Sequence, residues 1–252
     1  MIESLLLAVT RVTTFAAGRQ LTNATGFFFE RGKSLYLGTN RHVLLNEPTN
    51  HRPDRIEIEL HQDPDKLGAT TQVQIPLYGA DNKSRWRQGT DSAGMVDVAV
   101  LPIDRATLPG KHLLRAFTPA HLVRKLDVVE MGIPVLIVGF PLGIHDLVHK
   151  LPVARQAVVA SAFGVRFQGQ GCFLTDARMH RGTSGAPVVA RTGAEADGRA
   201  ELPWMLLGVH AARLDVTNRD ASQDDSLDLN IAWYADILLT LTEGTAPASA
   251  KA

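Results

Sequence analysis

The chain has 252 residues, of which 26 are basic and 26 acidic, so its formal net charge at pH 7 is zero. This balance provides no basic face and counts against nucleic acid as the main ligand. The single cysteine, Cys172, excludes a framework of disulfides within the chain and is most simply a small core residue. The length suits one large all-β domain or two smaller ones.

The N-terminal residues 1–11 hold a short apolar patch that Glu3 and Arg11 interrupt, without the leading positive charge of a signal peptide. No run approaches the roughly 18 apolar residues that span a membrane. We therefore expect a soluble, cytoplasmic protein without a propeptide. Residues 5–15 fit either a short helix or a strand, because the apolar spacing is helical while the threonines favour strands.

The first half of the chain reads as short strands separated by turns. A turn at Arg31-Gly32 joins two apolar runs into a hairpin, and residues 79–94 are predicted to form a surface loop. Residues 103–127 carry mixed charge and two prolines without sustained alternation, so we place a crossing between two barrels there. Strands are expected at 24–30, 34–38, 55–60, 72–77 and 96–101.

The second half repeats this pattern, with apolar residues between 230 and 241 at helical spacing that predict a C-terminal helix. We expect an exposed hairpin tip at 191–201, a mobile acidic loop at 213–227 and a flexible tail at 243–252. The acidic loop lacks the ligand spacing of a known calcium loop, so no metal is expected. Strands are expected at 135–140, 151–160, 172–175, 186–190 and 204–210.

Ser184 lies in the segment Gly182-Thr183-Ser184-Gly185-Ala186-Pro187, which has the features that a hydroxyl nucleophile needs. The glycines allow a tight turn and leave space for a substrate carbonyl. They also let the N–H groups of Gly182 and Ser184 converge on one point as an oxyanion hole. Turns favour glycine and serine in any case, so the motif alone more often marks an ordinary β-turn than a catalytic site.

A serine nucleophile requires a histidine base, which a carboxylate must orient. His42 follows the predicted strand 34–38 and begins a short helical turn. Asp97 lies inside an apolar, β-branched run, where an unpaired charge would be costly. We therefore expect its carboxylate to have a hydrogen-bond or ionic partner. We predict that these residues serve Ser184.

The three residues follow in the order His, Asp, Ser, separated by 97 − 42 = 55 and 184 − 97 = 87 positions. In this order the chain resembles the trypsin-like (chymotrypsin-fold) serine peptidases, and among them the compact bacterial HtrA-like type without a PDZ domain. The segments that carry the resemblance are Thr25-Gly26-Phe27-Phe28, Thr39-Asn40-Arg41-His42-Val43, Asp97-Val98-Ala99-Val100-Leu101, 138–143, Thr175-Asp176-Ala177 and 182–187.

The resemblance implies an all-β fold of two six-stranded antiparallel β-barrels, with the active site in the cleft between them and a C-terminal α-helix. Residues 1–110 would form the first barrel with His42 and Asp97. Residues 111–127 would connect it to the second barrel at 128–242, which would hold Ser184, the oxyanion hole and the specificity pocket. The implied reaction is peptide-bond hydrolysis through an acyl-enzyme, without a cofactor or metal.

The strand Gly208-Val209-His210 resembles the one that lines the primary specificity pocket of these peptidases, and we expect these residues and Arg178 to bind substrate. A histidine after Gly-Val is similar to that of glutamyl endopeptidases and picornaviral main proteases, and its imidazole can donate a hydrogen bond to a carboxylate or carboxamide. The alternative is a buried histidine bonded to the backbone.

The expected partner is a protein or peptide substrate, with no nucleic acid and no membrane. A cytoplasmic peptidase without a propeptide would damage its host if unrestrained, which raises the hypothesis of a regulatory protein partner. The rival interpretation is a latent or non-catalytic peptide-binding module that keeps the fold and is controlled by a partner.

Overall fold

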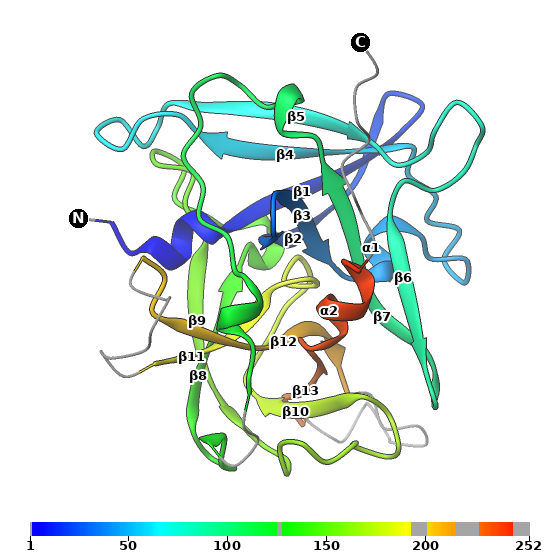
Figure 1. Ribbon diagram of the computed structural model, residues 1–252, viewed down its shortest axis with the longest axis vertical. Coiled ribbons are helices and arrows are strands. Elements are labelled where there is room, and N and C mark those ends of the chain that lie inside the picture. Colours follow the sequence, from blue (N-terminus) through cyan, green and yellow to red (C-terminus); the bar gives the residue numbers. More distant parts are fainter. Residues whose placement is uncertain (1, 125–127, 193–200, 215–226, 244–252) are drawn as a thin grey trace.

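The computed structural model describes residues 2–124, 128–192, 201–214 and 227–243. These residues form two antiparallel β-sheets, one mainly above the other in Figure 1. The first sheet has the strand order β5-β4-β1-β2-β3-β7-β6. Its strands are β1 (Val9–Ala16), β2 (Arg19–Arg31), β3 (Ser34–Thr39), β4 (Arg55–His61), β5 (Thr70–Pro76), β6 (Arg87–Asp91) and β7 (Gly94–Ile103).

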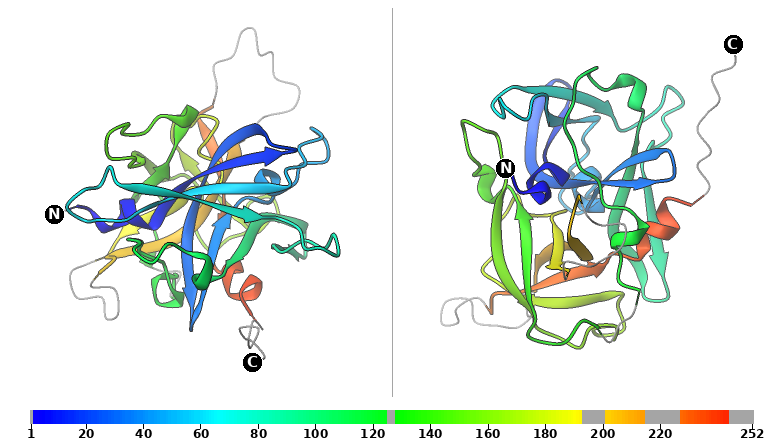
Figure 2. Two further views of the ribbon diagram at one scale, coloured as in Figure 1. Left: turned by 90° about the horizontal axis from the view of Figure 1, so that it is seen from above. Right: turned by 60° about the vertical axis from the view of Figure 1, so that its left-hand side comes forward.

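The second sheet closes on itself as a six-stranded barrel in the order β10-β13-β12-β11-β8-β9. It occupies the lower half of Figure 1, and the right-hand view of Figure 2 shows the same two-part arrangement from another side. Its strands are β8 (Pro134–Gly139), β9 (Val153–Val159), β10 (Cys172–Asp176), β11 (Pro187–Arg191), β12 (Trp204–Arg213) and β13 (Leu229–Tyr234).

The described helices are short. They are the α-helices α1 (Arg41–Leu44) and α2 (Ile237–Leu241) and the 3₁₀ turns Ser4–Ala8, Arg105–Thr107, Pro119–His121 and Pro141–Gly143. The N-terminal segment combines both expected conformations, since the turn Ser4–Ala8 leads into β1. No helix in the described ranges is long and apolar enough to cross a membrane.

The all-β architecture of a trypsin-like double barrel is confirmed, and the sheets differ from the expectation in two places. The first sheet has seven strands instead of six, because residues 87–91 form β6 where a surface loop was expected. This edge strand reads Arg-Gln-Gly-Thr-Asp, which has no apolar alternation to reveal it. The predicted loops at 193–200 and 215–226 and the tail at 244–252 lie outside the described residues.

The predicted C-terminal helix at 230–241 was wrong over its first half. Residues 229–234 form β13, which pairs with β10 and β12 and closes the second barrel. The helix is limited to α2, which turns back onto β6 and β7 of the first sheet (Figure 1). There the Arg87 guanidinium donates to the Leu241 carbonyl at 3.3 Å.

Three apolar clusters form the core, one in each sheet and one between them. The cluster between the sheets brings Phe27 and Tyr36 of the first sheet together with Val209 of the second and Leu238 of α2, all at most 1% exposed. Cys172 is also buried in it, as expected for a small core residue. The two halves therefore pack as one body with a shared interior.

Candidate active site

A bulge in β7 positions Asp97. Gln88 of β6 pairs with Ala99, but the next residue, Gly89, pairs with Val96, so Asp97 and Val98 have no partner residue on β6. Bulges of this kind change the direction of a side chain. The Asp97 side chain is 28% exposed, so it does not lie within the apolar interior that its sequence context suggested.

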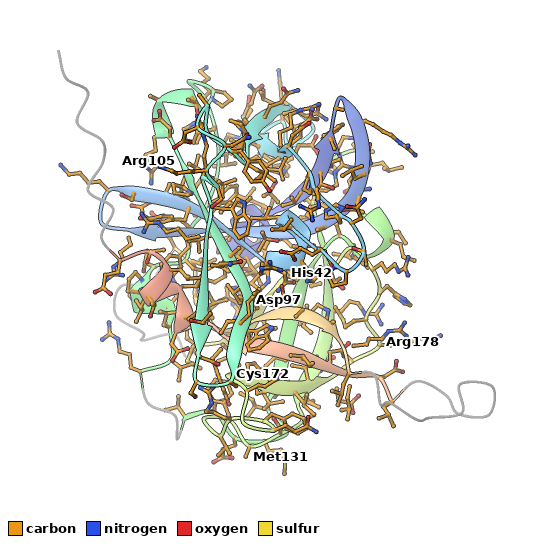
Figure 3. All side chains as sticks on the ribbon, turned by 90° about the vertical axis from the view of Figure 1, so that its right-hand side faces the viewer. His42, Asp97, Arg105, Met131, Cys172 and Arg178 are labelled. Atoms are coloured by element: carbon orange, nitrogen blue, oxygen red, sulfur yellow. The ribbon has the colours of Figure 1, made fainter. Side chains whose placement is uncertain are left out.

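Asp97 holds His42 through two hydrogen bonds. The ring Nδ1 of His42 lies 2.6 Å from Asp97 Oδ2, and the backbone N–H of His42 donates to Oδ1 at 2.9 Å. Asn40, which precedes α1, donates from Nδ2 to the Asp97 carbonyl at 2.7 Å. A carboxylate at Nδ1 fixes the tautomer that leaves Nε2 free to accept a proton. Figure 3 shows His42 and Asp97 together in the middle of the molecule.

The loop that carries Ser184 depends on two glycines in the left-handed region. Gly182 has φ +94 and Gly185 has φ +85, values that side chains rarely tolerate. A Cβ on Gly182 would overlap the Phe140 carbonyl, and one on Gly185 would overlap the Thr25 carbonyl and the Thr39 hydroxyl. Glycine is therefore required at both positions by conformation and by space.

Thr25 of β2 ties this loop to the first sheet. Its hydroxyl donates to the Gly182 carbonyl at 2.7 Å and accepts from the Phe140 N–H at 3.1 Å. Its backbone N–H donates to the Ser184 carbonyl at 2.9 Å. Thr25 is fully buried, so these hydrogen bonds are shielded from water.

The Ser184 hydroxyl donates to the carbonyl of Ala211 at 3.1 Å. Ala211 is the extra residue of a bulge in β12, since His210 pairs with Ala232 while Ala212 pairs with Ile231. Within the described chain, the N–H groups of Gly182 and Ser184 donate to no protein acceptor. They are free to bind a ligand oxygen, and the oxyanion hole stays a prediction.

His42 and Ser184 line one cleft of about 740 Å³. Gly182 and Arg181, of the loop that carries Ser184, line it as well, together with the first half of β2 and the segment that follows α1. The structure thus brings His42, Asp97 and the Gly182–Ser184 loop, which are three separated segments of the sequence, close together.

The predicted substrate-binding residues on β12 adjoin the loop that carries Ser184, since the His210 N–H donates to the Ala186 carbonyl and the His210 carbonyl accepts from the Gly185 N–H, both at 2.9 Å. His210 and Val209 are at most 2% exposed on β12, and a Cβ on Gly208 would meet the Trp233 carbonyl at 2.6 Å, so this stretch is tightly packed. Arg178 is exposed, and Figure 3 shows it at the periphery, away from His42 and Asp97. None of the four lines the cleft that contains Ser184.

Burial dominates the electrostatics of His210. It lowers the pKa of this imidazole to about 4, with a smaller contribution from the charge of His42. His210 Nδ1 is buried without a hydrogen-bond partner in the described structure. The ring is therefore neutral at pH 7. Among the described residues, no group of three or more His, Cys, Asp or Glu side chains could hold a metal ion.

The sequence reasoning missed Asn40, the bonding role of Thr25 and the carbonyl of Ala211. Thr25 and Asn40 belong to the segments that carried the family resemblance, and their proximity to the predicted triad was the available signal. The carbonyl of Ala211 left no signal, because a bulge depends on the register between two strands.

A family model described as a trypsin-like peptidase domain matches residues 24–194. The chain belongs to this family. The match includes His42, Asp97 and Ser184. No curated protein matches the chain.

Two solved structures resemble this trypsin-like peptidase domain. One, described as an HtrA-type protease, AlgW, with a tripeptide, has 18% identity and a TM-score of 0.54, and the match covers 93% of this chain and 58% of the other. The serine endoprotease from Yersinia pestis has 17% identity and a TM-score of 0.54, with 94% and 62% covered. This chain thus spans about 60% of their lengths, and at such identity the likeness shows the fold.

Proposed function

We propose that this trypsin-like peptidase domain is a serine endopeptidase that cleaves proteins or peptides. The observation that carries the proposal is the 2.6 Å contact between His42 and Asp97, made in the cleft that Ser184 also lines. A turn with a purely structural role requires neither a hydrogen-bonded Asp and His beside it nor two N–H groups without an acceptor.

The geometry supports a defined role for each group. Ser184 Oγ attacks the peptide carbonyl while His42 Nε2 takes its proton, and Asp97 stabilises the imidazolium that forms. The Gly182 and Ser184 N–H groups stabilise the oxyanion. His42 then gives the proton to the leaving amine, and a water molecule hydrolyses the acyl-enzyme by the same steps in reverse.

A latent form is the second candidate, and the hydrogen bond from Ser184 to Ala211 favours it. A hydroxyl that donates to this carbonyl is not donating to His42. Rotation about χ1 of Ser184 would direct it to the histidine, and such contacts often form only when substrate is bound. In the latent alternative, a partner protein would be needed to drive this rotation.

Labelling with a fluorophosphonate probe, read by intact mass, tests the proposal. Wild-type protein should gain one adduct, and the Ser184→Ala variant should gain none while keeping its fold by circular dichroism. Folded wild type without an adduct would contradict an assembled triad and support the latent module.

The pocket for the residue before the cut stays a prediction. We propose that His210, neutral at pH 7, donates to an acidic or amide side chain if the β12 segment opens toward substrate. Peptides that differ only in Glu, Gln or Leu before the cut would test it, since equal cleavage of all three would contradict a role for His210.

A further inference from the structure

The cleft that contains His42 and Ser184 is basic. Its lining includes Arg19, His42, His51 and Arg181, and no aspartate or glutamate. Apart from these residues the lining has no ionisable side chain, so its fixed positive charge comes from Arg19 and Arg181. Asp97, which is not among the lining residues, contacts His42 at 2.6 Å. The two arginines form a local excess of positive charge in a chain with equal numbers of acidic and basic residues.

The cleft lies on the side that receives the leaving half of the substrate. His42 protonates the leaving amine in the proposed mechanism, so the segment after the cleaved bond must pass beside His42. The cleft extends from His42 along residues 19–24 of β2 and the segment 46–51. These surfaces therefore meet the residues that follow the cut.

The first half of β2 has a free edge for this segment. β2 pairs with β3 only from Phe27 to Arg31, whereas its pairing with β1 extends back to Arg19. The Thr25 N–H points away from β1, since it donates to the Ser184 carbonyl. Backbone direction alternates with period two, so Asn23 presents its N–H and carbonyl to the same open side. An extended peptide can add there as a strand.

Two arginines flank this path at different distances from the cut. Arg181 is adjacent to Gly182, and its carbonyl accepts from the Leu142 N–H at 2.6 Å, which fixes its backbone beside the site. Arg19 precedes Thr25 by six residues, which is about 20 Å along an extended strand. Both side chains are exposed, and neither forms an ion pair in the described part of the chain.

Three acidic residues of neighbouring segments are engaged with other groups, and one of them is Asp97, which contacts His42. Glu47, in the segment after α1, pairs with Arg41 at 2.8 Å. Asp54 accepts from the Ala17 N–H at 2.6 Å and lies 3.5 Å from Arg55. Arg19 and Arg181 are thus left as free cations facing the path of the leaving segment.

We propose that the peptidase selects substrates that are acidic on the C-terminal side of the cleaved bond. Arg181 reads a carboxylate at the first or second residue after the bond, and Arg19 reads one about four to six residues after it. The inference rests on the proposed peptidase function and adds the class of substrate.

Fluorogenic peptides of one parent sequence test the proposal, with Asp, Asn or Lys placed singly at each of the first six positions after the cut. Asn is the neutral match for Asp. At low salt, kcat/KM should be about two- to five-fold higher for Asp than for Asn at the first or second position, in the range of exposed ion pairs. The preference should fade at 0.5 M salt.

Charge-reversed variants distinguish the contributions of the two arginines to this preference. Arg181→Glu should invert the preference near the bond to favour Lys, and Arg19→Glu should do so only at the distant positions. Lys33→Glu changes the net charge equally, and Lys33 is exposed at the opposite end of β2 and does not line the cleft, so this variant should keep the wild-type preference.

The outcomes distinguish the two proposals. Cleavage of Asp, Asn and Lys peptides at equal rates, or a preference that survives both reversals, would overturn the acidic selectivity and leave the peptidase function standing. Failure to cleave any peptide, combined with no fluorophosphonate adduct, would instead overturn the peptidase function on which the inference rests.

Discussion

The hydroxyl of Thr25 donates a 2.7 Å hydrogen bond to the carbonyl of Gly182, 157 residues further along the chain. This contact joins a strand of the first sheet to the loop that carries Ser184 in the second half. Gly182 is buried, and its carbonyl belongs to the same short turn as the two N–H groups proposed to bind the oxyanion. The shape of the oxyanion site is thus set from the opposite sheet.

Replacing this hydroxyl should damage both stability and activity. Thr25→Val keeps the shape but leaves the Gly182 carbonyl without its donor and the Phe140 N–H without its acceptor. We expect a loss of about 2 kcal/mol in the free energy of unfolding and slower fluorophosphonate labelling, while Thr25→Ser stays within about 1 kcal/mol of wild type. Urea denaturation measures the free energy of unfolding. A Thr25→Val variant that is as stable and as reactive as wild type would contradict the proposed role of the Thr25 hydroxyl.

Gly185 should tolerate no side chain. In Gly185→Ala, φ +85 is strained and the new Cβ overlaps the Thr25 carbonyl. We expect a loss above about 3 kcal/mol, or failure to accumulate folded protein. Gly32→Ala is the matched control, because Gly32 also has positive φ (+61) but open space around it, and it should cost only about 1 kcal/mol. Equal effects of the two substitutions would show that overlap with Thr25 contributes nothing.

Asp97→Asn should leave the fold intact and nearly abolish turnover. The amide would present an N–H to His42 Nδ1 and favour the tautomer whose Nε2 already carries a proton. We expect kcat to fall about 10³- to 10⁴-fold. Asp81→Asn, which removes an equal charge from an exposed turn where Asp81 pairs with Lys83, should retain wild-type kcat. An Asp97→Asn variant within ten-fold of wild type would exclude the proposed orientation of His42.

His210 should make the protein less stable as the pH falls from 7 to 5. Burial lowers its pKa to about 4 from 6.5 in the unfolded chain. Between these values the unfolded state binds more protons, so stability rises with pH, and this group alone should account for a loss of about 2 kcal/mol at pH 5.

Urea titrations of wild type and His210→Gln at the two pH values measure this loss, which the variant should lack. If the variant does not fold, an NMR titration of the His210 ring in the wild type replaces this test. A change in the chemical shift of the ring centred near pH 6.5 would contradict a buried neutral imidazole.

Local patterns were enough to predict much of this fold from the sequence. The hairpin around Arg31-Gly32 and the strand with Asp97 have apolar runs bounded by turn residues, and the predicted strands at both places are present. The order and context of His42 and Asp97 predicted their contact, and Ser184 lines the same cleft as His42. Each of these signals depends on neighbours within a few residues.

The remaining features depend on long-range pairing and had no local signature. β6 is polar because it lies at a sheet edge. The apolar residues of β13 fit a helix equally well, and only the pairing of β13 with β10 and β12 distinguishes the two. The bulges at Asp97 and Ala211 arise from the register between strands. The basic cleft combines residues from widely separated parts of the chain, so its charge is invisible in the balanced composition.

The packing of α2 has a consequence for the order of events during synthesis. This helix joins the core between the sheets through Leu238 and Leu241 and contacts β6 and β7, the hairpin that carries Asp97. A ribosome must therefore release residues 237–241 before the first sheet acquires its final support. In a nascent chain that has not yet released this helix, the hairpin that carries Asp97 would lack one of its packing partners.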